Sequence, residues 1–372
     1  MGRRVLVLVG TKKGAFIVEG DERRMDWSLR GPLCEAWPIH HLNVCPPATR
    51  SGGSLQESHD PPMPTLYAAG GSEWFGPAVW RSRDLGETWT QLGEGFTYGD
   101  DGPRIRKVWN VTPAHGALYA GVDPAGLFRS EDGGVSWTHV QGLREHPTCP
   151  GWQPGAGGLC LHSIVPHPSD PMQMWVAISA VGTFYSADGG VTWTPRNKGV
   201  RAGFLPDQYP ETGQCVHKLV RAPDGPGRLY QQNHCGVYRS VDGGANWEEI
   251  TEGLPSEFGF PMAVHPRDAE TVYVIPLTPD HARVVPDGKV AVWRTNDAGH
   301  TWAALRAGLP QQNAYVGVLR EAMAVDTLDP AGVYFGTSTG QLFGSANEGG
   351  SWALLADFLP PVWSVEVALV EA

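Results

Sequence analysis

The chain has 372 residues, of which 41% are hydrophobic and 18% are charged, and its formal net charge is −11. This negative charge, without any block of Lys and Arg, argues against nucleic acid or an anionic membrane as a partner. The 48 Gly, 32 Pro and 15 Trp residues are typical of an all-β protein with short strands and many tight turns.

The N-terminus predicts a strand and no export signal. The chain runs directly into the apolar residues Val5 to Val9, a run too short for a signal peptide or a membrane span. We therefore expect a cytoplasmic protein. Its six cysteines are then expected to be reduced thiols or metal ligands.

In chain order, the sequence predicts one domain over residues 1–372, built from seven four-stranded units. Residues 1–33 supply three strands and a degenerate turn, and residues 363–372 supply the missing first strand of that unit. The other units are expected at residues 38–98, 104–142, 159–198, 214–252, 258–307 and 318–358. Pairing the last strand with the first ones removes sheet edges that would otherwise invite aggregation.

Six of the units carry the motif S/T-x-D/N-x-G-x-x-W, whose tryptophans follow one another at intervals of 48 to 56 residues. A repeat of this length is typical of solenoids and propellers. In such a turn the Asp and Ser side chains bind backbone groups, Gly takes a special conformation, and Trp fills the layer between sheets. The residues at the D/N position, which we expect to be structural, are Asp84, Asp132, Asp188, Asp242, Asp297 and Asn347.

This motif resembles the Asp-box, or BNR repeat, of sialidases, sortilin-type ectodomains and photosystem II assembly factors. The resemblance implies an all-β β-propeller of four-stranded antiparallel blades. The six boxes and the unit shared by the two termini together predict seven blades, closed by the C-terminal strand. It implies little about function, because the box itself is structural.

An alignment of the inner strands selects one position per unit that we expect to face the central axis. Five of the seven residues at this position are ionisable, which a purely space-filling channel would not need. They are His40, Lys107, His162, His217, Phe260, Glu321 and Trp363.

The histidines at this position predict a metal site on the axis. His40, His162 and His217 would be ligands, with His234, Glu321 or a thiolate as further candidates, because Cys160-x-His162 and Cys215-x-His217 occupy equivalent places in neighbouring units. Such ligands suit zinc, iron or copper. Two alternatives are acid–base chemistry without a metal, and a hydrated channel lined by hydrogen-bonded histidines with core cysteines.

Long loops at residues 145–152 and 204–211 lead into the inner strands at Leu161 and His217, and they predict a ligand site on the same face. Loops of this length inside a compact repeat are usually functional or disordered. Aromatic and charged side chains over a polar pocket suit a small polar, sugar-like or aromatic ligand. The expected ligand-binding residues are Trp152, Tyr209, Arg106, Lys12 and Trp363.

The favoured function is an enzyme acting on a small polar or sugar-like molecule, with a metal as an optional cofactor. His217 would transfer protons, Lys107 would stabilise negative charge, and Glu321 would serve as base or ligand. The alternative is a non-catalytic module that binds a protein partner on the propeller face. Sialidase activity is disfavoured. Sialidases are six-bladed and need an arginine triad and a Tyr–Glu pair, whereas this chain has seven predicted blades, a histidine-rich axis and no such arginine signature. The arginines expected on this face, none in an F/Y-R-I-P segment, are Arg104, Arg106, Arg201, Arg283 and Arg320.

Overall fold

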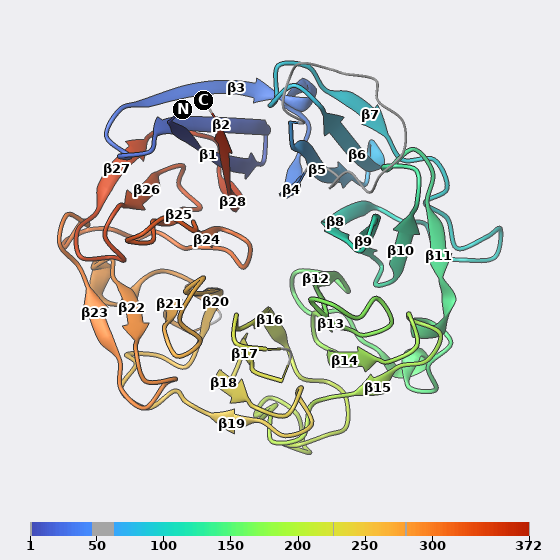
Figure 1. Ribbon diagram of the computed structural model, residues 1–372. Coiled ribbons are helices and arrows are strands. Elements are labelled where there is room, and N and C mark those ends of the chain that lie inside the picture. Colours follow the sequence, from blue (N-terminus) through green and yellow to red (C-terminus); the bar gives the residue numbers. More distant parts are fainter. Residues whose placement is uncertain (1, 47–62, 226, 280, 372) are drawn as a thin grey trace.

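The computed structural model describes residues 2–46, 63–225, 227–279 and 281–371. Within these residues, 28 strands form seven four-stranded antiparallel sheets, arranged in a ring around a central axis (Figure 1). The predicted seven-bladed β-propeller is therefore confirmed. Among the described residues, no helix has the length and apolarity needed to cross a membrane.

The blades follow one another along the chain, each with its inner strand first. Blade 7 consists of β28 (Val362–Glu371), β1 (Arg3–Thr11), β2 (Gly14–Asp21) and β3 (Trp27–Leu33). Blades 1 to 3 are β4 (Ile39–Cys45), β5 (Thr65–Ser72), β6 (Gly76–Ser82) and β7 (Thr90–Leu92); β8 (Lys107–Ala114), β9 (Ala117–Asp123), β10 (Leu127–Ser130) and β11 (Thr138–Val140); and β12 (Leu161–Pro166), β13 (Met174–Ile178), β14 (Gly182–Ser186) and β15 (Thr194–Pro195).

Blades 4 to 6 repeat the same order. They are β16 (Val216–Arg221), β17 (Leu229–Asn233), β18 (Gly236–Ser240) and β19 (Glu248–Glu249); β20 (Gly259–Val264), β21 (Val272–Pro276), β22 (Val292–Thr295) and β23 (Ala303–Leu305); and β24 (Met323–Val325), β25 (Val333–Gly336), β26 (Leu342–Ser345) and β27 (Ala353–Ala356). Short 3-10 helices lie at Cys34–Ala36, Gln141–Leu143, Cys149–Gly151 and Pro286–Gly288.

The ring is closed by antiparallel pairing of β28 with β1, as the sequence predicts. Val7 lies opposite Val367, and the pairing runs from Arg3–Glu371 to Thr11–Val362. Residues 5–9 are fully buried on both faces, because each blade is packed between two others. A continuous apolar strand, rather than an alternating one, satisfies that environment.

The third box shows how the motif shapes its turn. The Ser186 hydroxyl accepts a hydrogen bond from Gly190 N at 2.8 Å and donates to Asp188 at 2.8 Å. Asp188 accepts in turn from the backbone and side chain of Thr192. Gly190 has φ +94°, and Trp193 is buried with its indole N–H bonded to the Gly190 carbonyl. The box therefore stabilises the turn between the third and fourth strands.

An irregularity in the inner strands positions the residues near the axis. In six blades the pairing between the first two strands shifts by one extra residue, a β-bulge that re-aims a side chain. The residues at these bulges are His40, Trp109, His162, His217, Phe260 with Pro261, and Trp363. In blade 2 the bulge lies at Trp109, two residues beyond the aligned Lys107.

Candidate functional site

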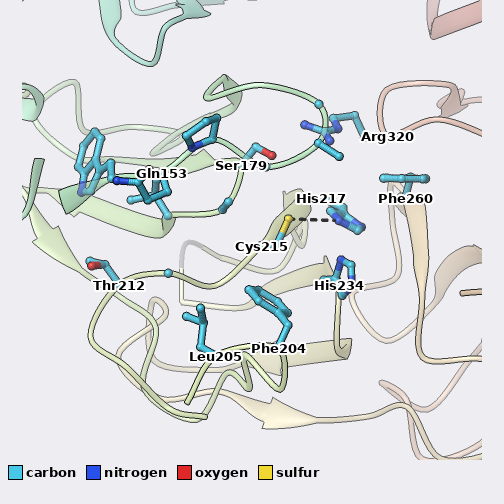
Figure 2. A pocket seen from close by; sticks show the side chains of 18 of the residues that line it. Gln153, Ser179, Phe204, Leu205, Thr212, Cys215, His217, His234, Phe260 and Arg320 are labelled. Atoms are coloured by element: carbon cyan, nitrogen blue, oxygen red, sulfur yellow. Dashed lines mark hydrogen bonds between the residues drawn. The ribbon is translucent and has the colours of Figure 1, made fainter. Parts of the chain in front are cut away.

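A pocket of about 540 Å³ lies beside the axis over blades 3, 4 and 5 (Figure 2). Both long loops predicted from the sequence border it, one through residues 151–157 and the other through residues 204–213. The inner wall is made by residues at the start of the inner strands of blades 4 and 5, and the rest by Ser179 to Val181, Arg283 and Arg320.

Three potential metal ligands meet on the inner wall of this pocket. Cys215 directly precedes β16, His217 is the bulge residue of that strand, and His234 lies in the turn between β17 and β18. A backbone hydrogen bond of 2.9 Å from His234 N to Cys215 O holds the turn against the strand. The Sγ atom and one ring nitrogen of each histidine lie within 4.8 Å of one another.

The orientation of His217 is set by the neighbouring blade. Its Nδ1 lies 2.6 Å from the carbonyl oxygen of Gly259, and since a carbonyl only accepts, Nδ1 carries the proton. Burial, together with the nearby positive charge of Arg320, holds the pKa of His217 well below its ordinary value of 6.5. The ring is therefore neutral at pH 7, and Nε2 presents a lone pair toward Cys215.

The spacing of these atoms suits a bound metal ion. The Sγ of Cys215 lies 3.5 Å from Nε2 of His217 (dashed in Figure 2). Zinc bonds of about 2.3 Å to sulfur and about 2.0 Å to nitrogen, at a tetrahedral angle, place those two atoms roughly 3.5 Å apart. The Gly259 carbonyl is the outer partner that a metal-bound imidazole normally has on its other nitrogen.

Arg320 lies at the axial end of the pocket and is 9% exposed. One guanidinium nitrogen is 3.4 Å from the Sγ of Cys160. The guanidinium also faces the rings of Trp109 and Phe260, at 5.3 and 5.9 Å from their centres. Among the described residues, no carboxylate lies within salt-bridge distance of Arg320.

The remaining wall is largely aromatic. Phe258 and Phe260 contact each other at right angles and both contact His217. Phe204 packs edge-on against His234, and Trp152 also lines the pocket. No Asp or Glu occurs among the described residues that line the pocket.

The structure does not bring His40 and His162 into the group formed by Cys215, His217 and His234. The His40 ring is stacked between Trp109 and Trp363, with ring centres 4.9 and 4.5 Å away. His162 is fully buried, and its two ring nitrogens bind Ser163 Oγ and Val216 O at 2.9 Å each. Both nitrogens of His162 are thus engaged by protein atoms, which corrects its expected place among the ligands.

Lys107 and Glu321 also lie away from the pocket. Lys107 is 3.6 Å from Asp123 and lies over the ring of Trp109. One carboxylate oxygen of Glu321 forms an ion pair with Lys218, and the other is buried without a hydrogen-bond partner. The sequence analysis expected both side chains to act beside His217, but each forms an ion pair elsewhere, Lys107 with Asp123 and Glu321 with Lys218.

Of the five expected ligand-binding residues, only Trp152 is among the described residues of the pocket wall. Tyr209 is 60% exposed on the rim loop, and Lys12 is exposed beside blade 7. Arg106 forms an ion pair of 2.6 Å with Asp123 and borders a second, more open depression together with Arg104. Trp363 instead supports the ring of His40.

The sequence analysis did not assign Cys215, Arg283 and Arg320 to the pocket. Cys215 was signalled by its spacing to His217, because residues i and i+2 of a strand share a face. Arg283 and Arg320 were among the arginines expected on this face, but nothing in the sequence pointed them at the histidines.

The six boxes, the seven blades and their closure lead to a structural family. The family model of the BNR/Asp-box repeat matches residues 184–195, which contain the third box. The chain is an Asp-box β-propeller. Among curated proteins, none matches it significantly.

Solved structures with the same architecture include enzymes and a peptide-bound protein. The GH74 xyloglucanase from Xanthomonas campestris has a TM-score of 0.61 and 20% identity over 97% of this chain, which spans 53% of that enzyme's length. YCF48 bound to D1 peptide has a TM-score of 0.50 and 17% identity, over 78% of this chain and 77% of that one. YCF48 from Cyanidioschyzon merolae has a TM-score of 0.53 and 15% identity, over 85% and 84%. At these identities the likeness establishes the fold.

Proposed function

We propose that this propeller is a metal-dependent enzyme that acts on a small polar molecule in the pocket over blades 3 to 5. The observation that carries the proposal is the convergence of Cys215, His217 and His234 on one wall of an accessible pocket. Structural zinc sites are usually closed by four protein ligands, whereas catalytic sites keep a position for water or substrate. Three ligands facing a pocket fit the second type.

The donor set favours zinc, with copper as the next candidate. One thiolate and two imidazoles are soft to intermediate ligands, which bind these ions well. When bound, the ion would supply a Lewis acid at the pocket wall. The chain's own part is to hold His217 in one tautomer through Gly259, and to exclude bulk water with Phe258 and Phe260.

Carboxylate-based glycoside hydrolysis does not fit this pocket. That chemistry ordinarily needs a pair of Asp or Glu residues on either side of the scissile bond. The described wall contains neither residue type. The likeness to the xyloglucanase therefore supports the fold, and the proposed chemistry rests on the metal ligands.

A peptide-binding propeller is the second candidate, because the rim loop exposes aromatic side chains. Phe204 is 48% exposed and Tyr209 is 60% exposed on the same loop. Exposed aromatic groups at the edge of a hollow often mark a docking site. The peptide bound by YCF48 gives a precedent for this use of the architecture.

Metal analysis of the purified protein tests the proposal. We expect about one zinc or copper ion per chain after incubation with the metal and removal of the excess. Cys215→Ser and His234→Ala should each weaken binding at least tenfold. Cys235→Ser is the matched control, because Cys235 is a buried cysteine next to His234 but outside the ligand group.

Turnover separates the two candidates. A panel of small esters and lactones should contain a substrate whose conversion stops on chelation, and also in Cys215→Ser. Unchanged metal content in both ligand variants would contradict the metal site. Stoichiometric metal without turnover on any panel member would favour the binding propeller.

A further inference from the structure

The strongest unassigned feature of the molecule is the charge of the pocket. The chain carries a net charge of −11, yet this pocket is lined by Arg283 and Arg320 and, among its described residues, by no Asp or Glu. We infer that the pocket takes a small organic anion, with a carboxylate or phosphate on an apolar body, and that Arg320 binds the charged group. This inference deepens the proposed function, on which it rests for the use of the pocket, but it is independent of the metal.

The hydrogen-bonding capacity of Arg320 is mostly unused within the protein. A guanidinium has five N–H donors and no acceptor. Among the described residues, Arg320 donates a hydrogen bond to the thiol of Cys160, a weak acceptor, at 3.4 Å. Arg320 lines the pocket, so its remaining donors are available to a ligand there.

A charge held at 9% exposure normally has a carboxylate partner, because moving an ion out of water is costly. Arg24 in this chain follows that rule: its side chain is 7% exposed and lies 3.3 Å from the buried carboxylate of Asp326. Arg320 has no such partner among the described residues and is held by aromatic faces instead. A bound anionic ligand could therefore serve as the counter-ion of Arg320.

The residues around Arg320 would select an anion with an apolar body. Phe204, Phe258, Phe260 and Trp152 line the pocket, and Phe258 and Phe260 contact each other. Arg283 and Arg320 both face the ring of Phe260, with guanidinium carbons 5.6 and 5.9 Å from its centre. A planar guanidinium beside an aromatic ring suits a ligand that has an apolar body and a charged end bound through two parallel hydrogen bonds.

The size and position of the pocket agree with a small ligand. Its volume of about 540 Å³ lies inside the range of roughly 300–1,000 Å³ that small-molecule sites occupy. Arg320 and Cys215 both line it, and Arg320 lies close enough to influence the pKa of His217. Figure 2 shows Arg320 and the ligand group on the same side of the pocket. An anion on Arg320 would thus lie next to the metal ligands.

Calorimetric titration with matched probes tests this inference on chelator-treated protein. Benzoate and phenyl phosphate are the anionic probes, and benzamide is the neutral probe of the same shape. We expect at least one anion to bind about tenfold or more tightly than benzamide, because charge-assisted hydrogen bonds contribute more than neutral ones. The carboxylate and phosphate arms identify which anion the site prefers.

Arg320→Gln should abolish the preference for the anion while leaving benzamide binding unchanged. Arg320→Lys should retain part of it, because a lysine keeps the charge but not the paired donors. Arg104→Gln is the matched control, because Arg104 is exposed and borders the other depression. Thermal unfolding of each variant checks that it is folded.

If Arg320→Gln does not fold, the salt dependence of wild-type binding decides the matter. Anion affinity should fall with rising ionic strength and benzamide affinity should not. Equal affinity for anion and amide, no anion binding at all, or a preference retained in Arg320→Gln would each overturn the inference. Because the metal is removed, such a failure is distinct from a failure of the metal site, which metal analysis measures separately.

Discussion

The carbonyl of Gly259 and the Nδ1 of His217 lie 2.6 Å apart and join the inner strands of blades 5 and 4. This contact makes Nε2 the free nitrogen of a neutral ring and directs it toward Cys215. A neutral imidazole can bind a metal without first losing a proton. The proton released on binding must then come from the thiol.

Metal affinity should therefore rise with pH, because the thiol of Cys215 must give up its proton to bind the ion as a thiolate. We expect tighter binding at about pH 8 than at about pH 6, with about one proton released per ion. Cobalt substitution should produce a thiolate-to-cobalt charge-transfer band that is absent in Cys215→Ser and present in Cys235→Ser. A band that persists without Cys215 would assign the sulfur ligand to another residue.

The polar side chain of the Asp-box should be replaceable by its amide but not by alanine. Asp297 accepts hydrogen bonds from Thr301 N, Thr301 Oγ1 and Thr295 Oγ1, and these bonds hold its pKa down at about 2. Asp297→Ala should lower the free energy of unfolding by about 1–2 kcal/mol. Asp297→Asn should lose less than half as much, because Asn347 serves the same turn in the sixth box. Urea unfolding at pH 7 compares the two variants, and equal losses would contradict the assigned role.

Glu366 should make the propeller less stable as pH rises toward neutrality. Burial, aided by the neighbouring Glu321 and partly opposed by Lys218, raises the pKa of Glu366 to about 7. A carboxyl with a raised pKa holds its proton longer in the folded state, so stability falls as pH rises from about 4.5 to about 7. The effect should reach about 2 kcal/mol, reduced by the water-accessible part of the side chain.

Glu366→Gln should flatten this part of the pH profile. Unfolding in urea at about pH 5 and about pH 8 measures the change. Glu371→Gln is the control, because Glu371 lies on the same strand but is exposed. Identical pH slopes in the two variants would exclude Glu366 as the source.

His40 should have the opposite effect at lower pH. Burial and the charge of Lys107 lower the pKa of His40 to about 3, and the ring is stacked between Trp109 and Trp363. A histidine with a lowered pKa resists protonation when folded, so its contribution is present above about pH 6.5 and is lost as pH falls. His40→Phe keeps an aromatic ring in the stack and removes the titration.

The free energy of unfolding of His40→Phe should therefore fall by about 2 kcal/mol less than that of the wild type between about pH 6.5 and about pH 4.5. His300→Phe provides the control, because His300 is exposed on the box of blade 5. A profile of His40→Phe that parallels the wild type would show that this ring does not govern acid stability.

The architecture was predictable because each box fixes a turn, and the turn fixes the order of strands around it. Ser186, Asp188 and Gly190 act within one turn, so their sequence spacing contains the whole interaction. The closing strand was predictable for a similar reason, because an incomplete blade at one end needed a strand from the other. Local chemistry and strand pairing were enough for both.

The site was less predictable, because a shared position in the blade does not make side chains meet. His40, His162 and His217 all occupy the bulge, but each ring binds an adjacent blade: His40 the indoles, His162 Val216 O and His217 Gly259 O. These contacts depend on the twist between blades, which no repeat spacing records. In blade 2 the turn at residues 115–116 is only two residues long, so the bulge falls at Trp109, nearer to its box than the spacing in blades 3 and 4 suggests.

The pairing of β28 with β1 has a consequence for biosynthesis. β1 leaves the ribosome well before its partner at residues 362–371, which emerges after six other blades have been translated. Until then Val5 to Val9 lack the strand that covers them in the finished ring. A nascent chain that stalls before this point would expose an unpaired apolar strand that is prone to aggregate. A chaperone would be most needed at this stage.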